Sequence, residues 1–116
     1  MAIFGYGRVS TKGQTTDTQK FEIETAGYRI DFWFDDAGIS GTVCADQRPE
    51  FKKLLTQIRD GETLVVTKLD RLGRNVADVA STIKSLTSRK IEVVVLQLGE
   101  VDLGSTAGKL MLTSEQ

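Results

Sequence analysis

Strand-like and helix-like segments alternate along the whole chain, and this alternation restricts the fold more than any other feature. The strand-like segments, apolar and rich in β-branched or aromatic residues, are 2–9, 30–34, 64–66 and 91–96. Helical spacing of apolar residues covers 16–26, 49–59 and 75–89, and a last helix that is cut short begins at Ser105 or Thr106. Parallel strands need a crossover connection, usually a helix. The order therefore predicts an α/β domain, with a mostly parallel sheet of four or five strands flanked by helices.

Residues that favour turns and helix ends separate these segments. Thr16 and Gln19 have the spacing of a capping box, and Gly27 is placed to end the helix that follows. Pro49 suits the first turn of the second helix. The stretch 35–47 is rich in Gly, Asp and Ser and is predicted to be a long loop. A loop of this length inside a compact domain is often functional.

The first two strands contain residues that predict close packing. Gly5 and Gly7 thin the first strand at a place where another group packs against it. Trp33 and Phe34 in the second strand are interpreted as core residues, not as a platform for stacked bases.

Composition excludes several kinds of site. The chain has 116 residues, enough for one domain with a core of its own. It has no histidine and one cysteine, Cys44, which excludes Ser–His and Cys–His pairs, a zinc cluster and an internal disulfide. A magnesium site built from carboxylates stays open. The single cysteine fits a reducing, cytoplasmic setting, and no apolar run approaches the roughly 18 residues of a membrane span.

Charged and nucleophilic residues gather after the predicted strands, where open parallel sheets bind their ligands. Arg8 and Ser10 lie two residues apart at the end of the first strand, so both can point into one crevice. The third strand is followed by Lys68, Asp70, Arg71 and Arg74, and the predicted loop adds Asp35, Asp36, Ser40 and Arg48. The net charge of −1 argues against a uniformly basic surface but allows such a local basic site.

A serine hydroxyl among several arginines suits attack on a phosphodiester. The transition state carries extra negative charge on its non-bridging oxygens, and arginine donates paired hydrogen bonds to them while staying charged. The arginines could replace a divalent metal in this role, so no metal or other cofactor is predicted. Each residue alone has a plainer interpretation: Ser10 as a loop residue, Gln19 as part of a capping box, Asp70 in a surface ion pair. Their gathering at one sheet edge favours a functional site.

Two common phosphate-binding motifs do not fit. The run 104–110 resembles a P-loop, but it has three residues between its glycines where four are needed. It also has leucine where a serine or threonine would hold magnesium. No Gly-x-Gly-x-x-Gly follows the first strand, which argues against a dinucleotide fold.

Taken in order, the motifs of this chain resemble those of the serine recombinases, the transposon resolvases and DNA invertases. The similar positions are Gly5-Tyr6-Gly7-Arg8-Val9-Ser10-Thr11, Gln14, Gln19, Ser40-Gly41, Arg48-Pro49, Leu69-Asp70-Arg71-Leu72-Gly73-Arg74 and Gly108-Lys109. They span the whole chain in the right order, and together they are highly specific although no single one is. The resemblance implies a resolvase-type catalytic domain whose doubly wound sheet has one antiparallel edge strand.

The resemblance also implies a reaction. Ser10 would attack a DNA phosphate, form a 5′-phosphoserine link and release a 3′ hydroxyl that later rejoins the strands, without ATP or a metal. The implied catalytic residues are Ser10, Arg8, Asp70, Arg71, Arg74, Gln14, Gln19, Arg48 and Tyr6, of which Arg8, Arg48, Arg71 and Arg74 would bind DNA. Asp70 would orient the arginines, and Gln14 and Gln19 would shape the serine loop. The proton acceptor for Ser10 stays open between a neighbouring carboxylate and water.

The implied partners are double-stranded DNA at a specific recombination site and further copies of the chain, as a homodimer or synaptic tetramer, with no membrane. In the family the last helix runs on, carries further catalytic arginines and precedes a helix-turn-helix DNA-binding domain. We therefore expect 1–116 to be a catalytic domain that is incomplete at its C-terminal helix and impaired in recombination. Gly7 stands where alanine is usual, and Gly13 could loosen the loop after Ser10.

One alternative function is kept beside the recombinase hypothesis. A flavodoxin-like module could hold a phosphate or a mononucleotide in the loop 10–12. The sequence does not distinguish resolution from inversion, and it does not identify a DNA target site.

Overall fold

The computed structural model describes residues 2–11 and 15–98 of the chain. The strands of this part are β1 (Ile3–Val9), β2 (Phe32–Ala37), β3 (Thr63–Val66) and β4 (Glu92–Val95). The helices are α1 (Asp17–Thr25), α2 (Pro49–Gln57) and α3 (Val76–Ser88), with 3₁₀ turns η1 (Ala45–Gln47), η2 (Leu69–Arg71) and η3 (Leu96–Leu98). None of these helices is long and apolar enough to cross a membrane.

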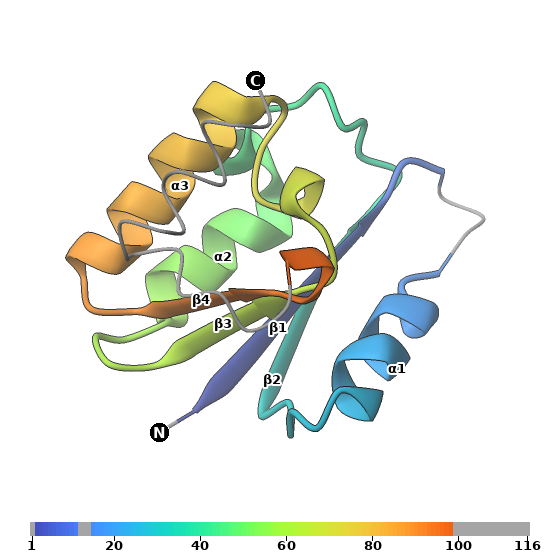
Figure 1. Cartoon of the computed structure of the whole chain (residues 1–116). Helices are drawn as coiled ribbons and strands as arrows, with labels where there is room; N and C mark the ends of the chain where they lie inside the picture. The colour runs from blue at the N-terminus through green and yellow to red at the C-terminus, as the bar shows by residue number, and fades with distance from the viewer. Residues whose placement is uncertain (1, 12–14, 99–116) are drawn as a thin grey trace.

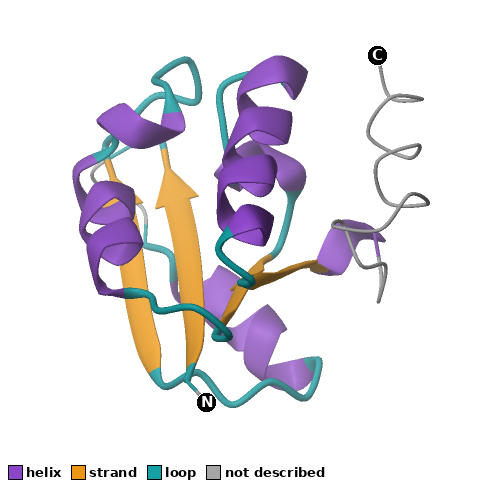
Figure 2. Cartoon of the chain, turned by 90° about the vertical axis from the view of Figure 1, so that its left-hand side faces the viewer, coloured by secondary structure: helices purple, strands orange, loops and turns teal. Residues whose placement is uncertain are grey.

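The strands form one sheet in the order β2-β1-β3-β4, and every neighbouring pair is parallel. Helix α1 covers one face of the sheet, and α2 and α3 cover the other (Figure 1; Figure 2 gives the view from the side). The predicted α/β fold is therefore confirmed. The antiparallel edge strand that the resemblance implies is not among the strands of the described residues, and the predicted last helix lies outside those residues.

The order of the strands determines where a ligand can bind. The chain winds outward from β1 to β2 in one direction and through β3 to β4 in the other. A crevice forms at such a reversal, beyond the carboxyl ends of the two central strands. In this sheet the crevice lies at the ends of β1 and β3, where the sequence places its arginines.

Both faces of the sheet are buried, which explains the nearly continuous apolar runs in its strands. Phe4 and Tyr6 of β1 point to the side of α2 and α3 and belong to the larger core cluster. Val65 of β3 points to the other side and packs with Ile23 of α1.

The indole of Trp33 packs directly against β1. A Cβ atom at Gly5 would lie 2.8 Å from Trp33 Cε3, and one at Gly7 would lie 2.8 Å from Trp33 Cζ2. Carbon atoms do not approach this closely, so both glycines are needed for the packing. The close packing predicted at Gly5 and Gly7 is confirmed, and Trp33 packs against the smaller core cluster as predicted.

Strand β2 extends into the segment that was predicted to be a loop. It begins at Phe32 instead of residue 30, and 35–37 continue it in parallel register with 7–9 of β1. The loop prediction was wrong for these residues because the polarity of Asp35 and Asp36 is typical of loops. Backbone pairing with β1 and specific partners for both carboxylates outweigh that local preference.

The buried carboxylate of Asp36 joins β1, β2 and α2. It accepts hydrogen bonds from the hydroxyl of Tyr6 at 2.7 Å and from the backbone N–H groups of Glu50 at 3.0 Å and Phe51 at 3.2 Å. Helix α2 begins after Arg48, whose side chain makes no cap. Asp36 therefore supplies from another strand the acceptor that the first turn of α2 needs.

The capping box predicted at the start of α1 is wrong. Thr16 precedes the helix but makes no side-chain cap, and its hydroxyl donates instead to Asp35 of β2. A side-chain cap is present on α3, where Asn75 Oδ1 accepts from the N–H of Asp78 at 2.8 Å. Gln19 is consequently free to point toward the sheet.

We predict that Asp36→Ala destabilises the fold by about 2–4 kcal/mol, because a buried hydroxyl and two N–H groups lose one charged acceptor. Urea denaturation followed by circular dichroism measures the change. The control is Asp46→Ala, which removes an exposed carboxylate and should change stability by at most about 0.5 kcal/mol. Equal stability of the two variants would contradict the role given to Asp36.

Candidate functional site

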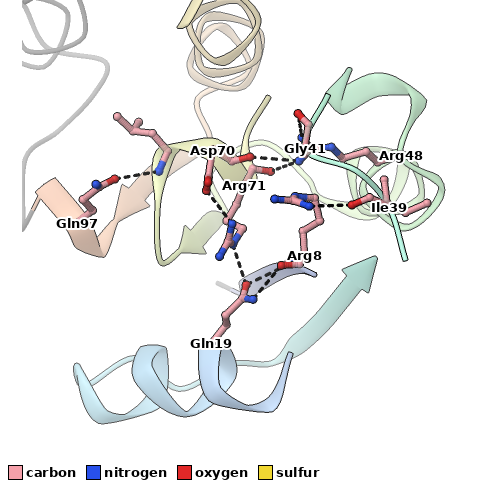
Figure 3. A network of polar contacts seen from close by, with 9 residues as sticks. Arg8, Gln19, Ile39, Gly41, Arg48, Asp70, Arg71 and Gln97 are labelled. Atoms are coloured by element: carbon pink, nitrogen blue, oxygen red, sulfur yellow. Dashed lines mark hydrogen bonds and ion pairs between the residues drawn. The ribbon is translucent and has the colours of Figure 1, made fainter. Parts of the chain in front are cut away.

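The candidate site lies where β1 and β3 end. Arg8 is the last residue but one of β1, and η2 after β3 contains Asp70 and Arg71. Gln19 of α1 reaches the same place, and so does Arg48, which is the residue directly before α2 (Figure 3). The structure thus brings together residues that are up to 63 positions apart in the sequence, from Arg8 to Arg71.

The carboxamide of Gln19 connects three elements. Its Nε2 donates to the carbonyl of Arg8 at 2.9 Å, and its Oε1 accepts from the backbone N–H of Arg8 at 3.1 Å. The same Oε1 accepts from Nε of Arg71 at 3.0 Å. The orientation of the carboxamide is fixed, because its oxygen faces two donors and its nitrogen faces an acceptor. Gln19 therefore positions the two arginines relative to each other.

Arg8 carries a positive charge that is poorly compensated. Its side chain is buried, with 9% exposure, and its Nη1 donates to the carbonyl of Ile39 at 2.7 Å. Its Nε is buried and has no hydrogen-bond partner among the described residues. Burial lowers the pKa of Arg8, and the charges of Arg48 and Arg71 lower it further, while Asp70 and Tyr6 nearby raise it without offsetting these effects. An anion bound at this place would relieve the crowding.

Asp70 forms an ion pair with Arg71 and not with Arg74. Its Oδ1 lies 2.8 Å from Nη1 of Arg71, whose side chain is 14% exposed, while that of Asp70 is 61% exposed. A pair with one exposed partner contributes little to stability. Its effect is to fix the plane of the Arg71 guanidinium, together with the bond from Nε of Arg71 to Gln19.

Arg48 is fully buried and its donors are used by the protein itself. Nε donates to the carbonyl of Val43 at 3.1 Å, and Nη2 to that of Gly41 at 3.5 Å. Nη1 donates to the carbonyls of Arg71 at 2.9 Å and Asp70 at 3.4 Å. The DNA contact that the sequence implied for Arg48 does not fit this geometry, because the side chain has 0% exposure. Arg48 holds the loop before η1 against η2.

Tyr6 lies below the site and not in it. The side chain is fully buried, donates to Asp36 and meets the ring of Phe51 edge-on, with 4.7 Å between centroids. Burial raises the pKa of its hydroxyl, and the neighbouring carboxylate of Asp36 raises it further. Tyr6 is therefore a neutral core residue that supports β1 two residues before Arg8.

Three other residues of the predicted site make none of the contacts described above. Ser10 is exposed and directly follows β1. Arg74 is exposed and lines a cleft of about 190 Å³ beside Asp70 and Val76, outside the network around Gln19. Gln14 lies outside the described residues. The roles predicted for these three stay predictions.

Sequence reasoning missed contacts that use the backbone or a residue outside any motif. The carbonyl of Ile39 holds Arg8, and no sequence pattern marks a carbonyl for such a role. Asp78 accepts from the backbone N–H groups of Ala45 and Arg74, so it joins the start of α3 to η1 and to the residues after η2. Its spacing from Asn75, which is that of a helix cap, was the available signal.

The described residues contain no group of three or more His, Cys, Asp or Glu side chains that could hold a metal ion. The charged groups of the candidate site are guanidinium donors and one exposed carboxylate. Such a set suits an anion such as a phosphate.

Fold and site together define a parallel α/β domain with a cluster of arginines at its switch point. The family model "Resolvase, N terminal domain" matches residues 3–115 of the chain. The chain therefore belongs to the resolvase family, as the sequence motifs implied.

Individual relatives agree with this assignment. The chain is 48% identical over 111 residues to the Transposon Tn2501 resolvase of Escherichia coli, which covers 95% of this chain and 57% of that protein. It is 45% identical over 111 residues to Serine recombinase PinR of Escherichia coli K12, with the same coverage of both chains. The N-terminal catalytic domain of TP901-1 integrase superposes with a TM-score of 0.77 at 31% identity, covering 98% of this chain and 90% of that one. The chain thus spans little more than half the length of the curated relatives it matches.

We predict that phosphate stabilises the chain through Arg8. At equal ionic strength, replacing chloride by phosphate should raise the Tm of the wild type by several degrees, because phosphate binds only the folded state. Phosphate also stabilises proteins in general by exclusion from their surface. Differential scanning fluorimetry should therefore compare Arg8→Gln, which loses most of the increase, with the exposed control Arg29→Gln, which keeps it. Equal increases in all three proteins would contradict an anion site at Arg8.

Proposed function

We propose that this chain is the nucleophile-bearing domain of a site-specific DNA recombinase that cuts double-stranded DNA with Ser10. The observation that supports the proposal most directly is the set of guanidinium groups around Arg8. Their charge is only partly compensated, and they lie at the strand end that Ser10 immediately follows. Membership of the resolvase family and the names of the relatives support the same function.

The proposed reaction is a phosphoryl transfer in two directions. Ser10 Oγ attacks the phosphorus of one DNA phosphate, so that an Oγ–P bond forms and the bond from phosphorus to the 3′ oxygen breaks. The 3′ oxygen leaves as a hydroxyl with a proton, and the 5′ end stays on the protein as a phosphoserine. After the ends are exchanged, a 3′ hydroxyl attacks the phosphoserine and releases Ser10. One phosphodiester replaces another, so no ATP is needed.

Arg8 and Arg71 are the residues proposed to contact the phosphate. Their guanidinium groups can donate to the non-bridging oxygens, where negative charge increases in the transition state. Gln19 fixes both arginines through the hydrogen bonds described above. Because Arg48 is buried, it is proposed as a positioning residue that keeps η2 in place.

Asp70 and Arg74 have exposed side chains beside this centre. Asp70 holds Arg71 and is the neighbouring carboxylate available to accept the Ser10 proton, with water as the other acceptor. Arg74 is proposed to contact the DNA backbone next to the cleaved phosphate. The proposed partners are duplex DNA with a recombination site and further copies of the chain as a dimer or synaptic tetramer, in the cytoplasm.

We predict that Ser10→Ala abolishes a covalent protein–DNA adduct. Labelled duplexes are incubated with each variant and separated on a denaturing gel, where the adduct migrates with the protein. The matched control is Ser85→Ala, which removes an exposed serine of α3 that belongs to none of the motifs and should retain the adduct. Tryptic digestion should place the phosphate on the peptide 9–12. An adduct that persists in Ser10→Ala would refute the proposed nucleophile.

A second outcome separates the proposal from a nucleotide-binding function. A free mononucleotide, added in place of the duplex, should neither bind the loop after β1 tightly nor compete with DNA at equal phosphate concentration. Tight saturable binding of the mononucleotide, with no response to the duplex, would favour the flavodoxin-like alternative.

A further inference from the structure

We infer that Gln97 is a positioning residue for Arg71, which it influences by holding the η2 turn from η3, the turn that follows β4. This inference rests on the function proposed above. Gln97 belongs to none of the sequence motifs, yet its side chain bonds to the first residue of η2 (Figure 3) and its backbone bonds to Thr67, two residues before that turn begins. Its side-chain Oε1 accepts from the N–H of Leu69 at 3.3 Å, and its backbone N–H donates to the carbonyl of Thr67 at 3.0 Å.

The η2 turn needs this contact because it has no cap of its own. The first N–H groups of a helical turn find no acceptor within the turn. The residue before η2 is Lys68, whose side chain has donors only and makes no cap. Leu69 is the first residue of the turn, and the Gln97 oxygen accepts its N–H from outside. Only the oxygen of the carboxamide can face a backbone N–H, so the orientation of Gln97 is determined.

Three side chains from three elements hold η2 in place. Gln19 from α1 accepts from Nε of Arg71, and Arg48 at the start of α2 donates to the carbonyls of Asp70 and Arg71. Gln97 from η3 is the third, and it contacts the opposite end of the turn from the Arg71 carbonyl. The bonds of Gln97 are to backbone atoms, so it acts on a phosphate through the position of Arg71.

Without this acceptor the first turn of η2 is held less firmly, and the Arg71 guanidinium occupies its phosphate-binding position for less of the time. We therefore expect Gln97→Met to weaken the binding of inorganic phosphate about fivefold, the effect of losing one ordinary hydrogen bond. Methionine has a similar length but lacks an acceptor of comparable strength. Exchange of the Leu69 amide hydrogen should become about tenfold faster in this variant.

Two further variants make the test specific. Gln97→Glu keeps a carboxyl oxygen that can accept from Leu69, so slow exchange of that amide and the Nε–H signal of Arg71 should be retained. Gln57→Met introduces the same methionine at the exposed last residue of α2 and should leave the dissociation constant for phosphate within twofold of the wild type. All variants are compared by ¹⁵N NMR of the 116-residue chain, whose amide spectrum also shows whether each variant is folded.

The possible results separate this inference from the proposed function. If Gln97→Met binds phosphate as the wild type does, with an unchanged Arg71 signal, the inference is wrong and the proposed function stands. The inference is also wrong if Gln97→Glu loses protection of Leu69 as fully as Gln97→Met, since the acceptor is then not the cause. If the arginine signals of the wild type do not respond to phosphate at all, the proposed function fails, whatever Gln97 does.

Discussion

The buried guanidinium of Arg48 is the interaction on which the geometry of the site depends. A buried charge without hydrogen bonds is costly, so the backbone carbonyls that surround Arg48 must stay where they are. Those carbonyls belong to Gly41 and Val43 on one side and to Asp70 and Arg71 on the other. The loop after β2 and the turn after β3 are thereby held together. Arg48 keeps these two segments in contact. The segments in turn position the arginines at the ends of β1 and β3.

This arrangement concentrates positive charge in a chain whose net charge is −1. Carbonyl dipoles satisfy the donors of Arg48 but do not neutralise it, and Asp70 is too exposed to compensate three guanidinium groups. The lowered pKa of Arg8 and its unpartnered Nε are the local consequences. Such a group costs folding stability while it prepares the site for an anion, a common relation between stability and function. The positive charge of the arginine cluster therefore indicates an anionic ligand, although the net charge of the chain does not.

Most of the fold could be predicted from sequence because it depends on periodicity. The alternation of strands and helices determined the parallel α/β architecture, and the buried residues Phe51 and Leu54 lie on the predicted face of α2. The end of β2 could not be predicted in this way. Asp36 is polar and lies two residues before Gly38, which is typical of a loop, and only the three-dimensional structure supplies its partners on β1 and α2.

The candidate site, like the fold, could be predicted from the sequence only in part. Motifs at the strand ends predicted the gathering of Arg8, Asp70 and Arg71, since parallel strands end at one edge of a sheet. The contacts that fix these groups could not be predicted: Gln19 was expected to shape the serine loop or to cap a helix, not to hold Arg71, and Gln97 belongs to no motif. Arg48 was predicted to meet DNA, because a motif shows that an arginine is required but not on which side of the backbone it lies. The structure shows the Arg48 side chain buried, and its contact with DNA stays a prediction that this burial does not favour.

The most direct test of the central claim, that the arginines at the ends of β1 and β3 form a site for a DNA phosphate, is an NMR titration with a short duplex. The Nε–H signals of Arg8 and Arg71 are followed at low salt and again after salt is added. The account predicts that both signals move together with the backbone amide of Ser10, and that added salt reverses the shifts as phosphate contacts require. If the duplex leaves these signals unchanged while shifting only arginines away from the crevice, the site is not where DNA binds and the account is contradicted.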